Sequence, residues 1–160
     1  MEEGIGVIEH VDEIDQKIMD LLSEDGRLSY AELGRILNLS RVSVRDRVNR
    51  LIESGIIERF SIIINPAKVG YNISAFFEID VNPNKLNEVA KILADNKFVL
   101  SVNQMTGPSR LHMHACLWDN QHLQQFLIDT VYKLPGINAV NSCVLLRGFK
   151  TKRGGIKIGN

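Results

Sequence analysis

The fold of the first part of the chain is decided by residues 29–55, which read SYAELGRILNLSRVSVRDRVNRLIESG. Ser29 followed by Glu32 is a capping box, so the sequence predicts a helix that begins at about residue 30. The inward positions of this helix are predicted to be Leu33, Ile36 and Leu37. Asn38 tolerates the left-handed conformation of a tight turn, and Ser40 is a suitable cap for a second helix. A short helix, a tight turn and a longer helix indicate a helix-turn-helix.

The second of these helices is predicted to bury Val44, Val48 and Leu51, which recur at spacings of four and three. Its other faces carry four arginines, whose guanidinium groups are suited to phosphates and guanine edges in a major groove. A charged face that is merely solvated is the alternative, but the preceding turn and serine cap favour DNA reading. The predicted DNA-binding residues are Ser40, Ser43, Asn49, Arg41 and Arg45 (toward bases), and Arg47 and Arg50 (toward phosphates).

The segments on either side of this motif complete the first domain. Apolar residues at 14, 18, 21 and 22 share one face and predict an earlier helix, with Asp12 as its N-cap. Residues 56–64 are rich in β-branched side chains and predict a linking strand, which begins near 57 and ends at Asn65-Pro66. We therefore expect a DNA-binding domain over 1–60 and a second domain with a C-terminal tail over 61–160.

The second half alternates between strand and helix patterns. Strands are predicted over 73–81, 99–106, 111–118 and 140–149, with one helix after the first strand and another after the third. The order βαββαβ is that of a ferredoxin-like unit, so the fold class is α+β. Both helices of such a unit cover one face of the sheet. The other face must be either solvated or buried by another chain, and we expect a homodimer.

His112, His114 and Cys116 share one face of the third predicted strand, and imidazole and thiolate groups are zinc ligands. Residues at this spacing lie about 7 Å apart, which is wide for tetrahedral ligands, and no fourth ligand is evident. We expect polar residues of a subunit interface rather than a metal site. We also find no pattern that predicts catalytic residues or a cofactor.

The composition sets limits on the class of protein. The 160 residues contain 19 basic and 19 acidic side chains, so a nucleic-acid partner must be recognised by a local patch and not by net charge. No apolar stretch has the roughly 18 residues of a membrane helix, and residues 1–4 lack the basic region of a secretory signal. Two cysteines are too few for a disulfide framework, which predicts a cytoplasmic protein with reduced thiols.

A series of short stretches, in this order along the chain, is typical of one known family of proteins. They include Ile14–Ile18, Asp25–Ser29, Ala31–Gly34, Leu39-Ser40, Arg47-Val48, Arg50-Leu51, Ser54–Ile57, Asn65-Pro66 and Leu134–Ile137. By these stretches the chain resembles the Lrp/AsnC family, also called feast/famine regulators, from about residue 12 to 150. The resemblance implies transcriptional regulation by a helix-turn-helix domain that binds double-stranded DNA, and a ferredoxin-like domain that dimerises and senses a small effector such as an amino acid. It also implies assembly into tetramers, octamers or larger discs.

One loop departs from the family pattern, which commonly has glycine, two variable residues, an acid and an aromatic residue. This chain has Arg110 in place of the acid. A guanidinium favours carboxylates or phosphates where an acid favours ammonium groups, so we expect no response to ordinary neutral amino acids. A surface ion pair of Arg110 is the alternative. The resemblance places the effector-binding residues at Thr106, Gly107, Pro108, Ser109 and Arg110.

Two other functions are compatible with the same chain plan. Siroheme decarboxylases resemble Lrp/AsnC proteins, and in such an enzyme His112, His114 and Arg110 would hold or protonate a tetrapyrrole carboxylate. The other alternative is a metabolite-sensing module without DNA binding. The four arginines of the second motif helix favour the DNA-binding regulator over both.

Overall fold

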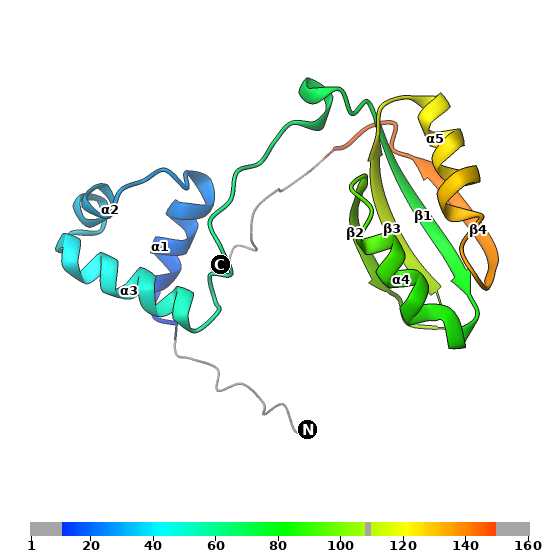
Figure 1. Ribbon diagram of the computed structural model, residues 1–160. Coiled ribbons are helices and arrows are strands. Elements are labelled where there is room, and N and C mark those ends of the chain that lie inside the picture. The colour runs from blue at the N-terminus through cyan, green and yellow to red at the C-terminus, as the bar shows by residue number, and fades with distance from the viewer. Residues whose placement is uncertain (1–10, 108–109, 150–160) are drawn as a thin grey trace. The chain divides into compact units, whose positions relative to one another are not determined.

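The computed structural model describes residues 11–107 and 110–149 (Figure 1). The chain forms two compact units, and the division between them along the chain falls between Ile63 and Ile64. The predicted C-terminal tail and two of the predicted effector residues, Pro108 and Ser109, lie outside the described residues.

The first unit contains three helices, α1 (Glu13–Glu24), α2 (Tyr30–Leu37) and α3 (Arg41–Glu53). Each begins where a side chain accepts a hydrogen bond from the exposed backbone amides of the first turn. Capping boxes start α1 and α2, and Ser40 caps α3, as predicted. The core of the unit consists of the fully buried side chains Ile18, Leu33, Val44 and Val48.

The turn between α2 and α3 depends on two backbone features. Asn38 adopts the left-handed conformation, with φ of 57°, and ends α2. A Cβ atom on Gly34 would lie only 2.6 Å from the carbonyl oxygen of Leu39, so a side chain at this position would force the turn apart. The prediction that Ile36 faces inward is wrong, because its side chain is 56% exposed at the edge of the apolar stripe.

The linking strand predicted over 56–64 is not formed. Residues 58–65 have no strand hydrogen bonding, and the side chains of Phe60, Ile62 and Ile63 are exposed. A β-branched sequence becomes a strand only when another strand pairs with its backbone groups. In the described chain no strand pairs with this segment, so its residues have the composition of a strand but do not form one.

The second unit contains four strands, β1 (Ile73–Val81), β2 (Val99–Gln104), β3 (Arg110–Leu117) and β4 (Ile137–Val144). They form one antiparallel sheet in the order β2-β3-β1-β4. Helix α4 (Leu86–Ala94) connects β1 to β2, and α5 (Asn120–Phe126), extended by a π-helical turn over Leu127–Val131, connects β3 to β4. This is the predicted ferredoxin-like arrangement (Figure 1).

Both helices pack on the same face of the sheet. The alternate side chains Ala75, Phe77 and Ile79 of β1 are fully buried there, together with Val89 of α4 and Phe126 of α5. The sequence predicts the last strand over 140–149, but β4 runs over 137–144. Its pairing with β1 ends at Val144, which lies opposite Ala75 near the start of β1. No helix of the described residues is long and apolar enough to cross a membrane.

Candidate nucleic-acid interface

The N-terminal end of α3 is organised by two serines. The backbone N–H of Ser43 donates to Oγ of Ser40 at 3.0 Å, and the two hydroxyl oxygens lie 2.9 Å apart. Both side chains are exposed. The end of the helix therefore presents hydroxyl groups and unpaired backbone amides, and this combination suits a phosphate oxygen.

The polar residues of α3 lie on two flanks of its buried stripe. Arg41, Arg45 and Asn49 are four residues apart and form one flank, and all three are exposed. Nε and Nη2 of Arg45 donate to one oxygen of Asp46 at 3.0 and 2.9 Å. Because both members of this pair are more than half exposed, the pair is weak and the guanidinium is available to a partner.

The other flank is held by α1. Nη1 of Arg47 donates to Oδ2 of Asp12 at 2.6 Å and to Oδ1 of Asp15 at 2.8 Å, and Nη2 of Arg50 donates to Oδ2 of Asp15. The side chain of Asp15 is 0% exposed. The predicted DNA-binding set is thus divided, with two arginines bound by carboxylates within the chain. We call Asp12, Asp15, Arg47 and Arg50 the α1–α3 cluster.

The electrostatics of this cluster favour the ionised groups. The backbone N–H of Asp15 and the guanidinium of Arg47 lower the pKa of Asp12 from 3.8 to about 2. Hydrogen bonds to Asp12 and Asp15 raise the pKa of Arg47. Asp12 and Arg47 are therefore both charged at neutral pH. In the described residues no buried side-chain polar atom lacks a hydrogen-bond partner.

The buried position of Asp15 and its pairing with two arginines were not predicted from the sequence, where Asp15 is only an acidic residue in the first turn of α1. A signal was present, because Asp15 lies three residues before Ile18 and seven before Leu22, on the apolar stripe of α1. A carboxylate in such a stripe must find cationic partners when it is buried. The spacing does not say which cations these are.

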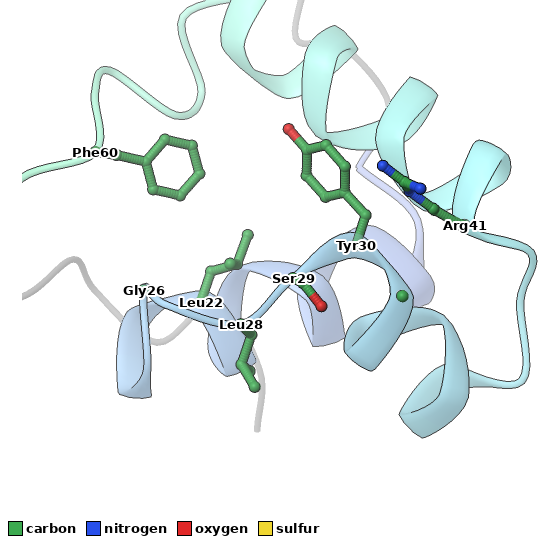
Figure 2. Close-up of a pocket in the computed structure, with 8 residues that line it drawn as sticks. Leu22, Gly26, Leu28, Ser29, Tyr30, Arg41 and Phe60 are labelled. Carbon is green, nitrogen blue, oxygen red and sulfur yellow. The ribbon is translucent and has the colours of Figure 1, made fainter.

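A cavity of about 570 Å³ opens beside the start of α3 within the first unit (Figure 2). Its walls are mostly apolar, and the rings of Tyr30 and Phe60 and the side chain of Leu22 border the hollow. Arg41 lines the side that belongs to α3. None of the predicted effector residues takes part in this cavity, and of the predicted DNA-binding residues only Arg41 does.

The predicted effector loop follows β2 in the second unit. Gly107 has a φ of 108°, a left-handed conformation that favours glycine, and Thr106 is exposed. Nε of Arg110 donates to Asp80 at 3.0 Å, and its Nη1 lies 3.8 Å from Glu78. The hydrogen bond to Asp80 and the charge of Glu78 raise the pKa of Arg110. The arginine that replaces the family's acid thus pairs with carboxylates of β1.

The sheet face opposite the helices carries stacked rings. The ring of Phe76 lies between those of His114 and His112, at centroid distances of 4.3 and 5.8 Å. Nε2 of His114 lies 2.7 Å from Oγ of Ser74, and Cys116 is 6% exposed. Stacking accounts for the rings of Phe76, His112 and His114, and a hydrogen bond joins His114 to Ser74. Among the described residues no group of three His, Cys, Asp or Glu side chains is placed to hold a metal ion.

Comparison with known families and relatives agrees with this arrangement. Residues 11–52 match the AsnC-type helix-turn-helix domain, and residues 74–154 match the Lrp/AsnC ligand binding domain. The transcriptional regulator LrpA of Pyrococcus abyssi is 36% identical, over 88% of this chain and 99% of its own. The regulator Ptr1 of Methanocaldococcus jannaschii is 35% identical, over 88% of this chain and 95% of its own.

Solved structures show the same fold. The structure of Escherichia coli AsnC superposes with a TM-score of 0.85 at 22% identity, over 92% of this chain and 99% of that one. A transcriptional regulator of Neisseria meningitidis in complex with L-Met superposes with a TM-score of 0.87 at 24% identity, over 92% and 97%. With both domains matched in order along the chain, this protein belongs to the Lrp/AsnC family of helix-turn-helix transcriptional regulators.

Proposed function

We propose that this regulator binds duplex DNA as a homodimer, with the flank of α3 that carries Arg41, Arg45 and Asn49 in the major groove. The observation that carries the proposal is the exposure of two guanidinium groups four residues apart, directly after the Ser40 cap. Arg41 and Arg45 read base edges, for which guanidinium groups are the commonest partners. Ser40 and Ser43 bind a phosphate at the start of the helix.

A second copy of the chain is the proposed partner of the uncovered sheet face. That face has no helix over it in the described residues, and it is lined by the half-buried side chains of Phe76, His112 and His114. Pairing of two such faces removes them from water and joins two helix-turn-helix units in one particle. A dimer of this kind engages two half-sites about 34 Å apart on the DNA. We also propose that these dimers assemble into tetramers or octamers.

The second unit is proposed to bind a small effector and not to carry out catalysis. The match to a ligand binding domain and the L-Met complex of the Neisseria regulator support an effector. The proposed residues are Thr106, Gly107, Pro108, Ser109 and Arg110, of which Arg110 selects an anionic metabolite. Its pairing with Asp80 is exposed and weak, so a carboxylate or phosphate ligand can replace Asp80. A regulator that acts on DNA in this way is expected in the cytoplasm.

The DNA-binding proposal is tested with the full-length protein and DNA fragments selected from the genome by their binding. Arg41→Ala and Arg45→Ala should each weaken binding to the selected sequence by about 1–3 kcal/mol and relax the base preference at one position. Lys91→Ala is the matched control, because it removes one exposed positive charge from α4 in the other unit. Fluorescence anisotropy measures the affinities. If all three variants bind like the parent, the proposed DNA surface is wrong.

A further inference from the structure

The α1–α3 cluster joins two helices through charged groups that are far apart in the sequence. Asp15 is separated from Arg47 by 32 residues and from Arg50 by 35. Its two carboxylate oxygens accept hydrogen bonds from both guanidinium groups and, at 3.3 Å, from the backbone N–H of Asp12. A fully buried carboxylate is stable only with such partners. The contact of α1 with α3 therefore favours positions of both arginines on the α1 side.

The two arginines are not equivalent to Arg41 and Arg45. The side chain of Arg47 is 26% exposed and that of Arg45 is 54% exposed, although both belong to the same helix. Arg50 is half exposed, but its guanidinium is directed to Asp15. To contact a phosphate, either arginine would have to give up its hydrogen bond to the buried carboxylate and leave Asp15 with one counter-charge in place of two, which is costly.

We propose that Asp15 is a positioning residue for DNA recognition, which holds Arg47 and Arg50 against α1 and keeps both guanidinium groups off the phosphates. This inference rests on the proposed function, because it concerns how the same helix meets DNA. It replaces the phosphate contacts that the sequence pattern predicts for Arg47 and Arg50. The carboxylate fixes the rotation of α3 about its axis, so that the flank with Arg41, Arg45 and Asn49 faces the groove. It also removes two mobile cations that would attract any DNA sequence.

The salt dependence of binding separates this role from phosphate contact. Each phosphate that a cation neutralises on duplex DNA changes the slope of log affinity against log salt by about 0.9. Arg50→Ala should leave this slope unchanged for the full-length protein, since Arg50 contacts Asp15 and not DNA. Arg50→Ala removes an exposed end of the cluster while Arg47 still pairs with Asp15, so the variant is expected to fold. A slope reduced by about 0.9 in Arg50→Ala overturns the inference.

Asp15→Asn tests the positioning role in the opposite direction. The amide has nearly the same shape but no charge, so Arg47 and Arg50 are released. The salt slope should steepen by up to about 1.8, affinity for unrelated DNA should rise, and the ratio of specific to non-specific affinity should fall. If Asp15→Asn only lowers stability, the salt slope, the affinity for unrelated DNA and the ratio of specific to non-specific affinity stay unchanged for the folded protein. A folded Asp15→Asn protein with the parent's slope and ratio contradicts the proposal.

Two further variants keep the test decisive. Glu13→Gln is the control for removing one carboxylate from the first unit, because Glu13 is exposed on α1 and belongs neither to the α1–α3 cluster nor to the flank of α3 that carries Arg45. If Asp15→Asn does not fold, Asp12→Asn releases one of the two hydrogen bonds of Arg47 and should steepen the slope by a smaller amount. An unchanged slope in Asp12→Asn would then count against the proposal. If Arg41→Ala and Arg45→Ala do not weaken binding, it is the proposed DNA surface that fails, whatever the slope of Arg50→Ala.

Discussion

The α1–α3 cluster and the cluster around Arg110 use the same chemistry in different surroundings. In each, two carboxylates pair with arginine, and the hydrogen bond from Arg47 to Asp15, at 2.8 Å, is close in length to that from Arg110 to Asp80, at 3.0 Å. Asp15 is completely buried, whereas Arg110, Asp80 and Glu78 are each about half exposed. Water solvates the exposed groups around Arg110 well when they are unpaired, so their ion pairs contribute little to stability. Only the α1–α3 cluster fixes how one helix packs against another. The burial of the carboxylate partner, and not the number of ion pairs, therefore decides whether an arginine of this protein holds the fold together.

The difference also bears on function. A guanidinium that pairs with exposed carboxylates can exchange them for a ligand at little cost. A guanidinium that pairs with a buried carboxylate serves the architecture of its own domain. On this view Arg110 and Arg45 are available to partners, whereas Arg47 and Arg50 are not.

The largest expected effect comes from removing the buried carboxylate. Asp15→Ala should lower the free energy of unfolding of the first unit by about 2–4 kcal/mol, somewhat below the usual cost of breaking a buried pair, because both arginines regain access to water. Urea titration followed by circular dichroism reports mainly on the helices of the first unit. The fluorescence of Trp118, the single tryptophan, reports on β3 and α5 of the second. The Trp118 transition should not move.

The control for this measurement is Asp46→Ala, which removes an exposed carboxylate from the same unit. Its unfolding transition should match that of the parent. Equal losses of stability in Asp15→Ala and Asp46→Ala would show that burial does not distinguish the two carboxylates, and the comparison would fail.

An intermediate effect is expected from acid. The pKa of Asp12 is about 2 in the folded protein and 3.8 without its partners, so the folded state favours the ionised carboxylate. The stability that this carboxylate contributes is complete above about pH 4 and is lost as the pH falls toward 2. Asp12→Asn keeps a side chain that caps α1 but removes the charge. Thermal unfolding of the first unit between pH 5 and 2 should therefore depend less steeply on pH in the variant, and identical profiles would contradict the assignment.

The smallest effect is expected at the exposed cluster. Arg110→Ala should leave the Trp118 unfolding transition unchanged within experimental error, since water replaces the guanidinium at Asp80 and Glu78. The measurement is the same urea titration at neutral pH. A loss as large as that of Asp15→Ala would mean that the sheet depends on Arg110, and would remove the distinction between the two clusters.

Local chemistry explains why so much of the first unit could be predicted. The helix starts at Asp12, Ser29 and Ser40 each depend on a side chain and an amide three residues away, and Asn38 needs only its own tolerance of positive φ. Such interactions are visible in any short window of sequence. The alternation of buried and exposed residues in β1 is visible in the same way.

The failed predictions depend on partners that a window of sequence does not contain. Residues 56–64 have the composition of a strand but no strand pairs with them in the described chain. The end of β4 is set by the start of β1, about 70 residues away in sequence. Ile36 has the right residue type and nearly the right spacing for a core position, yet no side chain of another helix covers it fully.

The sequence by itself determined the order of the helices and of the four paired strands, the helix-turn-helix, the ferredoxin-like plan and the family, because periodicity and capping operate over a few residues. Only the tertiary structure decided which arginines of α3 pair with a buried carboxylate. The four arginines look equivalent along the helix, and it is the buried carboxylate of Asp15, brought from α1 by the packing of Ile18, Leu33, Val44 and Val48, that divides them. A buried charge must be paired, and which cation pairs with it depends on how the helices pack.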